Sequence, residues 1–157
     1  MADLRQQVIT RGRPLPQLTL DNHEFYEAAR QGELRFQRCA DCRAWRHYPR
    51  PSCPQCLSRR FAWERASGRG RIYTWTIVHG PTLPAFEGEI PYNVVDVLLD
   101  EGIHFQSQLL DCPPEDIHAD LRVEATFVPV SDDVTLVKFR RAADSTRSPR
   151  SGGQGAA

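Results

Sequence analysis

The sequence lacks the features of a membrane-spanning or secreted protein. No apolar run approaches the length of about 20 residues that a transmembrane helix needs. The N-terminal stretch MADLRQQVITRGRPLPQ has no apolar core of the kind found in signal peptides. We therefore expect a cytoplasmic protein. In a reducing compartment, paired cysteines bind metal more often than they form disulfides.

Lysine is almost absent, since 19 of the 20 basic residues are arginine and only Lys138 is lysine. The formal net charge is zero, but the charges are unevenly distributed. Residues 35–71 contain ten arginines and two acidic residues, whereas residues 87–133 contain twelve acidic residues and one arginine. A chain of 157 residues is long enough for one domain, or for a small module joined to a larger one. The charge distribution favours two modules.

Cysteine, in contrast, is well represented, and four of the five cysteines form two CxxC pairs. Ten residues separate the pair Cys39 and Cys42 from the pair Cys53 and Cys56. Each CxxC loop directs two sulfur atoms to one point, and two such loops complete a tetrahedral site with bonds of about 2.3 Å. Four thiolates leave no open coordination position, so we predict a structural zinc. Two disulfides or a redox CxxC are alternatives that the compartment and the second pair disfavour. A rubredoxin-like iron site has the same ligands and stays open.

Secondary-structure signals flank the cysteines on both sides. A helix is predicted after Asp21 or Asn22, either of which can cap it, and Gly32 ends it. Five strands with alternating or β-branched residues follow the ribbon, at residues 71–79, 92–99, 103–110, 121–130 and 135–141. Five strands fit a small OB-fold barrel better than a sandwich, which needs about seven.

We therefore predict a mainly β protein made of five segments. They are an N-terminal arm (1–20), a helix (21–33), a four-cysteine zinc ribbon (34–66), a five-stranded OB-fold barrel (67–141) and a disordered tail (142–157).

This arrangement resembles a family of bacterial and archaeal proteins that join an N-terminal helix, a rubredoxin-like zinc ribbon and a C-terminal OB-fold. The resemblance covers about residues 18–141 and is carried by FYEAARQGELRFQRCADC, HYPRPSCPQC, SGRGRIYTWTIVH, IPYNVVDVLLDEG and VKFRR. Arg43 and Leu57 stand where glycine commonly follows the second cysteine of each pair in the family, and Asp120 lies near where a glycine usually precedes the fourth barrel strand. In the two cysteine loops this departure bears on the backbone geometry and not on the metal ligands.

The resemblance implies a non-catalytic accessory subunit. Family members associate with thiolase-like enzymes, namely thiolases, aldolases or condensing enzymes, or with a hydratase. The implied ligand of such a complex is a coenzyme A thioester, from fatty acyl or steroid side-chain metabolism. Because thiolase-like enzymes are commonly dimers, a heterotetramer of two plus two subunits is expected. On this interpretation the chemistry belongs to the partner, and we assign no catalytic residue.

Eight residues are candidates for contacts with the ligand or the partner. Arginine suits the phosphates of coenzyme A, an aromatic helix face suits a partner protein, and Trp75 with His79 can line a pocket. Each also has a plainer interpretation, as packing within the chain or as an ordinary surface side chain. The eight are Phe25, Tyr26, Arg46, Tyr48, Arg50, Arg69, Trp75 and His79.

The main alternative is a single-stranded nucleic-acid-binding protein, because zinc ribbons and OB-folds often bind nucleic acid. The ribbon is basic, but the surplus of eleven negative charges over residues 87–133 repels a polyanion, so nucleic acid is not the expected partner. Autonomous catalysis is a third possibility. None of the five histidines lies in a nucleophile or metalloprotease motif, and Cys112 has no paired base in the sequence.

Overall fold

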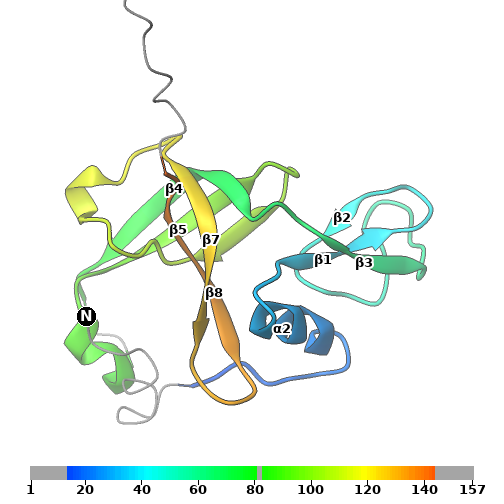
Figure 1. The fold of residues 1–157 in the computed structure, drawn as a ribbon, viewed down its shortest axis with the longest axis horizontal. Coiled ribbons are helices and arrows are strands. Elements are labelled where there is room, and N and C mark those ends of the chain that lie inside the picture. Colours follow the sequence, from blue (N-terminus) through cyan, green and yellow to red (C-terminus); the bar gives the residue numbers. More distant parts are fainter. Residues whose placement is uncertain (1–13, 81–82, 144–157) are drawn as a thin grey trace, which may run out of the picture.

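The computed structural model of the chain describes residues 14–80 and 83–143. Most of the predicted arm and tail lies outside these residues. The described part contains one α-helix, two short 3₁₀ helices and two β-sheets (Figure 1). The predicted fold class, a helix followed by a four-cysteine ribbon and a five-stranded barrel, is confirmed. Within the same ranges, every helix falls short of the length and apolar content required to span a bilayer.

Helix α2 (His23–Arg30) turns one apolar side toward the rest of the molecule. Its buried residues are Phe25, Ala28 and Ala29. Asn22 occupies the cap position, but its side chain accepts a hydrogen bond from the Thr19 N–H and donates one to the Gln17 carbonyl. The asparagine therefore fixes the incoming chain, not the first turn of the helix. Gly32 adopts the left-handed conformation, with φ of 75°, and ends the helix as its position predicts.

Three antiparallel strands in the order β2-β1-β3 form the ribbon. Their bounds are Arg35–Cys39 for β1, Trp45–Arg46 for β2 and Phe61–Arg65 for β3. The first CxxC pair lies in the β1–β2 connection, and the second lies in the longer loop between β2 and β3. With one strand of only two residues, this sheet is too small to be stable by itself.

The second sheet has the strand order β6-β5-β4-β7-β8 and curls into a barrel. The bounds are β4 Arg69–Val78, β5 Tyr92–Leu99, β6 His104–Ser107, β7 Arg122–Pro129 and β8 Thr135–Arg141. The 3₁₀ helix η1 (Pro84–Glu89) connects β4 to β5, and η2 (Pro114–Asp116) lies between β6 and β7, where the sequence predicts a short helical turn. A parallel bridge between Leu109 and Phe139 joins the end of β6 to β8 and closes the barrel.

One hydrophobic core runs from the helix through the ribbon into the barrel. The ring of Phe25 lies 6.2 Å from that of Phe36 in β1 and 6.2 Å from that of Phe105 in β6, measured between centroids. Phe105 in turn contacts Phe139 of β8, at 5.7 Å. The ribbon and the barrel therefore share a core, and this core fixes how one module sits on the other.

Strands β4 and β5 approach each other closely at Gly70. A Cβ atom at this position would lie 2.6 Å from the carbonyl oxygen of Leu98 and 2.9 Å from Cγ1 of Val97. Because the nearer atom is backbone within the sheet, it cannot move away without disturbing the strand pairing. Gly80, just after β4, has no neighbouring atom within 4 Å of such a Cβ.

We expect Gly70→Ala to lower the free energy of unfolding by about 1–3 kcal/mol, the usual cost of overpacking. The control Gly80→Ala should change it by less than about 0.5 kcal/mol. Urea denaturation followed by circular dichroism measures both values. Equal stability of the two variants would contradict the close approach of β4 and β5.

Candidate metal centre and junction cavity

The two CxxC loops share one backbone geometry. The N–H of Arg43 donates to the Cys39 carbonyl at 3.2 Å, and the N–H of Leu57 donates to the Cys53 carbonyl at 2.9 Å. Arg43 and Leu57 have φ of 63° and 59°, and Asp120 before β7 has φ of 63°. Arg43, Leu57 and Asp120 therefore all adopt the left-handed conformation that favours glycine, at a cost of about 1–2 kcal/mol per residue. The turns retain their shape despite the loss of glycine.

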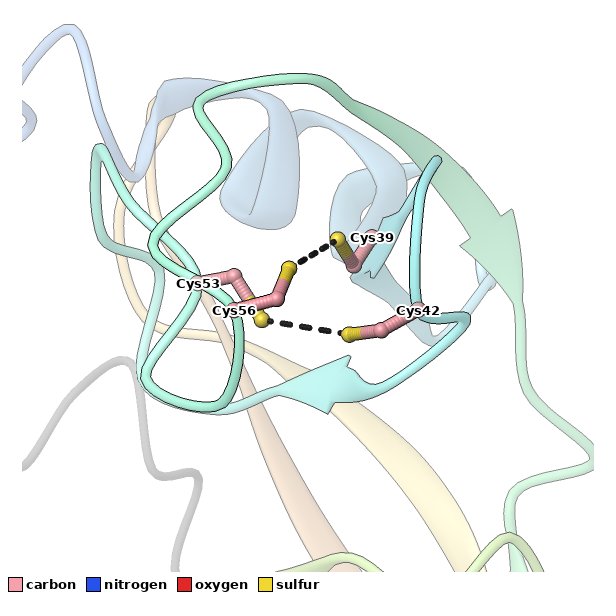
Figure 2. A group of neighbouring side chains, drawn as sticks. All are labelled: Cys39, Cys42, Cys53 and Cys56. Carbon is pink, nitrogen blue, oxygen red and sulfur yellow. Dashed lines mark hydrogen bonds between the residues drawn. The ribbon is translucent and has the colours of Figure 1, made fainter.

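The four cysteine side chains converge on one point (Figure 2). Their Sγ atoms all lie within 4.8 Å of one another. The Sγ atoms of Cys39 and Cys56 are 3.6 Å apart, and those of Cys42 and Cys53 are 3.5 Å apart. A tetrahedron with metal–sulfur bonds of about 2.3 Å has edges of about 3.8 Å, so the cluster fits a tetrathiolate metal. Each contact joins one CxxC pair to the other, which means that a bound metal would tie the two loops together.

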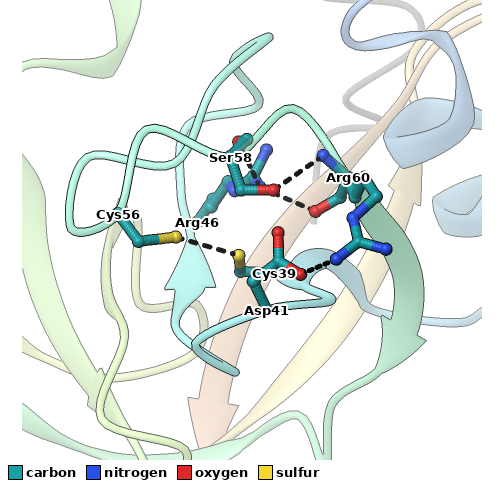
Figure 3. Close-up of polar contacts among 6 residues, drawn as sticks. All are labelled: Cys39, Asp41, Arg46, Cys56, Ser58 and Arg60. Atoms are coloured by element: carbon teal, nitrogen blue, oxygen red, sulfur yellow. Dashed lines mark hydrogen bonds and ion pairs between the residues drawn. The ribbon is translucent and has the colours of Figure 1, made fainter.

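Arg46, at the end of β2, supports the cluster from inside the ribbon (Figure 3). Its side chain is only 1% exposed. The guanidinium donates to the backbone carbonyls of Ser58 and Arg60, each at 3.1 Å. It thus holds the segment that follows the second cysteine pair against β2. This position gives Arg46 a structural role, since it does not reach solvent.

The surroundings of Cys39 favour the thiolate form that metal binding requires. The backbone N–H of Cys42 lowers the pKa of Cys39 to about 5, with help from the N–H of Asp41 and the guanidinium of Arg46. A thiolate that accepts hydrogen bonds is favoured because these donors stabilise its charge. With four sulfur ligands, a zinc ion here would have no open position for substrate or water, so its contribution would be structural.

Ion pairs compensate part of the charge that the sequence segregates. Within the ribbon, Arg43 pairs with Glu64, and Arg60 pairs with Asp41. Acidic residues of the barrel segment pair with arginines of β4, β7 and β8, in the pairs Arg71–Asp120, Arg122–Asp100, Arg140–Glu124 and Arg141–Asp116. Of these pairs only Arg71–Asp120 joins residues 35–71 to residues 87–133, so folding reduces the contrast between the basic and the acidic segment only in part.

The loop directly after β2 connects the metal centre to the barrel. The ring of His47 stacks on Phe105 of β6, with centroids 4.7 Å apart and planes at 16°. Tyr48 donates a hydrogen bond from its hydroxyl to Oε1 of Gln106, at 3.0 Å. Arg46 immediately precedes these two residues. Three consecutive residues, Arg46 to Tyr48, therefore link the interior of the ribbon to the barrel.

A cavity of about 580 Å³ lies at this junction. It is lined by the start of α2, by the loop at residues 47–49 and by parts of η1, β5, β6 and β8. The lining residues that bear on its chemistry are Phe25, Tyr26, His47, Tyr48, Phe86, Tyr92, Phe105, Gln108 and Lys138. Three separate parts of the fold thus meet around one space.

His47 is the unusual group in this lining. Burial, with a further contribution from Arg50, lowers its pKa to about 4, so the imidazole is neutral at pH 7. Neither Nδ1 nor Nε2 has a hydrogen-bond partner within residues 14–80 and 83–143, and both atoms are buried. A neutral imidazole has one donor and one acceptor, and leaving both unpaired in a buried position is costly.

The eight predicted contact residues are distributed over several places. Phe25, Tyr26 and Tyr48 border the junction cavity, although Phe25 is also part of the core. Arg50 is exposed beside the same loop, and Arg69 borders a separate cavity of about 200 Å³ near Gly32. Trp75 lies in the second half of β4 and His79 just after it, and β4 ends near η1, away from the ribbon (Figure 1). The eight predicted contact residues, which include the buried Arg46, therefore do not form one site.

Sequence reasoning missed His47 and the barrel residues around it. His47 lies in the stretch HYPRPSCPQC, between the two cysteine pairs, and only folding reveals that this stretch faces β6. Lys138 stands out in the sequence as the single lysine, and it is buried, at 6% exposure, next to Gln108 in the cavity wall. Its uniqueness was the signal available in the sequence, but no local motif connects Lys138 to the ribbon.

Comparison with known proteins identifies both modules. The family model described as ChsH2, rubredoxin-like zinc ribbon domain, matches residues 27–62. The model described as ChsH2, C-terminal OB-fold domain, matches residues 63–128. The zinc-ribbon match, together with the convergent sulfur atoms, supports a structural zinc at the four cysteines.

Individual proteins are similar over most of the chain. A probable enoyl-CoA hydratase alpha subunit from Thermomonospora curvata is 38% identical over 138 residues, which cover 87% of this chain but only 42% of that protein. A DUF35 domain-containing scaffold protein from Methanocaldococcus jannaschii is 34% identical over 97 residues, covering 61% of this chain and 68% of the relative. This chain therefore spans less than half the length of the hydratase subunit and about two thirds of the scaffold protein.

A solved structure shows that the similarity extends to the three-dimensional fold. A chain of the Ltp2-ChsH2(DUF35) aldolase is similar with a TM-score of 0.74 and 36% sequence identity. The alignment covers 82% of this chain and 100% of the other. The similarity thus includes the whole of that aldolase component.

We expect Arg46→Gln to weaken zinc binding by about 10-fold to 100-fold, the range typical of groups that orient metal ligands. The variant loses the paired contacts to the Ser58 and Arg60 carbonyls that hold the second cysteine loop in place. Competition with a chromogenic chelator measures the affinity. Arg59→Gln is the matched control, because Arg59 is exposed in the same loop, and its affinity should equal that of the wild type. Equal affinities for both variants would contradict the supporting role of Arg46.

Proposed function

The chain belongs to the DUF35 family, whose members join a ChsH2-type zinc ribbon to an OB-fold, and from this membership we propose that it is a non-catalytic accessory subunit of an acyl-CoA-processing enzyme. The observation that carries the proposal is the similarity to a component of the Ltp2-ChsH2(DUF35) aldolase over that component's full length. The names of the relatives describe scaffold proteins and a hydratase alpha subunit. The names of the aldolase component and of the hydratase subunit support an enzyme partner for this chain.

The metal centre supports an accessory role and not a catalytic one. Its four cysteines would fill the coordination shell of zinc and leave no site at which a carbonyl could be polarised. Among the other described residues, His104 contacts Asp96 at 3.1 Å on the barrel surface, but no serine or cysteine is hydrogen-bonded to this histidine. Within the described residues, no carboxylate is hydrogen-bonded to the neutral, stacked His47. We propose that the partner supplies the catalytic groups.

The exposed side of the ribbon is suited to the anionic part of coenzyme A. Arg50 and Arg59 are exposed, and neither forms an ion pair with the residues of the described ranges. Arginine binds phosphate oxygens through a planar, multidentate donor set. Tyr48, which is 58% exposed, lies beside Arg50. We propose that this side of the ribbon faces the shared thioester ligand in the complex.

The proposed partner is a thiolase-like subunit of the aldolase, thiolase or condensing type, with a hydratase as the second possibility. A two-plus-two heterotetramer remains the proposed assembly, since thiolase-like enzymes commonly form dimers. The proposed substrates are fatty acyl or steroid side-chain thioesters of coenzyme A. The assembly and the acyl group are independent parts of the proposal, because the first concerns protein contacts and the second concerns a ligand.

We expect the chain to form a stable complex with a thiolase-like or hydratase subunit encoded in the same genome. Co-expression followed by size-exclusion chromatography with light scattering measures the complex and its mass. Cys39→Ser should abolish the complex, because a ribbon without its metal loses its shape, while the barrel keeps its strand content by circular dichroism.

Cys112→Ser is the matched control, because Cys112 lies outside the sulfur cluster, and it should assemble like the wild type. Assembly by Cys39→Ser would exclude the ribbon from the docking surface. Failure of the wild-type chain to assemble with any such subunit would refute the accessory role itself.

A further inference from the structure

The second half of β4 has a neighbouring strand on one side and, among the described residues, none on the other. Strand β7 pairs with β4 over residues 69–71, and the last backbone hydrogen bonds on that side join Ile72 to Leu121 and to Asp120. From there β4 continues with β5 alone, toward η1 (Figure 1). Residues 73–78 therefore form a free edge in a barrel that is otherwise closed.

The strand register shows which backbone groups this edge presents. Leu99 of β5 donates its N–H to the carbonyl of Ile103, on the β6 side. Because backbone groups alternate in direction along a strand, the even-numbered residues of β5 point to β4 instead. Their partners in β4 are Thr74, Thr76 and Val78. The residues between these partners, Trp75 and Ile77, therefore direct their N–H and C=O groups away from β5, to the open side.

The free edge carries no feature that would keep another strand away. Natural sheet edges are usually protected by charged side chains or proline. Residues 73–78, with the sequence YTWTIV, include neither. The side chains from Tyr73 to Thr76 are all exposed. The backbone groups of Trp75 and Ile77 that point outward have no hydrogen-bond partner in residues 14–80 and 83–143, so they are available to a strand from outside the chain.

The edge is complementary to a second copy of itself. Two antiparallel copies related by a two-fold axis at Thr76 would place Trp75 of each copy opposite Ile77 of the other. Each opposed pair then exchanges two hydrogen bonds, so every outward group of these two residues finds a partner. Like charges do not meet, because the segment is uncharged and the whole chain has a formal net charge of zero. Thr76 would face Thr76 across the axis, which is a favourable cross-strand pair.

We propose that the chain forms a homodimer in which residues 73–78 of two copies pair as antiparallel strands, with Thr76 on the two-fold axis. Such an interface uses the same surface on both subunits. Because the shared strand is short, the dimer is in reversible exchange with the monomer. The inference goes beyond the proposed function and does not depend on it, since it concerns the chain without an enzyme partner.

Sedimentation equilibrium of the full, zinc-loaded chain tests the dimer. We expect the average mass to rise reversibly from that of a monomer to that of a dimer between micromolar and near-millimolar concentration. A monomer at every concentration, or growth beyond the dimer, would overturn the proposal, because pairing about a two-fold axis uses the free edge of each copy completely.

Charged variants at Thr76 test the axis. Thr76→Lys and Thr76→Glu should each weaken dimerisation by about five-fold at low ionic strength, because like charges then lie directly opposite each other. An equimolar mixture of the two variants should dimerise at least as well as the wild type, since lysine then faces glutamate. A mixture that dimerises no better than either variant alone would remove Thr76 from the axis and refute the proposed pairing.

Cysteine cross-linking in the Cys112→Ser background tests the register. Opposed residues that exchange no backbone hydrogen bonds have Cα atoms about 4.5 Å apart, which a disulfide can span. Thr76→Cys should therefore give a covalent dimer with oxidised glutathione, seen by non-reducing electrophoresis. Thr74→Cys is the matched control, because Thr74 is exposed on the same face of β4 but would lie about 13 Å along the strand from its counterpart. Equal cross-linking of both variants, or of neither, would contradict the proposed register.

Discussion

The meeting of four sulfur atoms at one point is the constraint on which the ribbon depends. The three-stranded sheet includes a strand of two residues and has little core of its own, so strand pairing alone cannot hold it. In zinc-finger peptides, a structural zinc contributes about 10–16 kcal/mol of apparent binding free energy at pH 7. A contribution of this size explains how Arg43 and Leu57 can occupy left-handed positions that normally require glycine.

The consequences of this constraint extend from the cysteines to the barrel. Arg46 joins the second cysteine loop to β2, and the next residue, His47, stacks on Phe105 of β6. Phe25 and Phe36 continue the same core on the other side of that contact. The metal centre therefore shapes one wall of a cavity that it does not touch. In the proposed accessory subunit, such a structural metal centre positions the surfaces that contact a partner and a ligand, and it takes no part in the catalysed reaction.

The sequence was most informative where a feature is local. The spacing of the cysteines predicts their convergence, strand periodicity predicts the barrel, and Gly32 predicts the end of the helix. Properties that depend on distant segments could not be predicted in this way. Arg46 has no sequence signal that separates a buried arginine from an exposed one. The cavity joins His47 to Lys138, which lie 91 positions apart, and the charges segregated along the chain are partly brought together by ion pairs such as Arg71–Asp120.

Hydrogen exchange of the amides, compared between the zinc-loaded and the chelator-treated chain, tests most directly whether the metal centre organises the junction. The account predicts that metal removal abolishes protection in β1, in β2 and in the loop at residues 47–49, and that it lowers protection in β6, where the loop contacts the barrel. Strands β4, β5 and β7 should keep theirs. Unchanged protection of the 47–49 loop after metal removal would contradict the account, because the loop would then hold its place without the four cysteines.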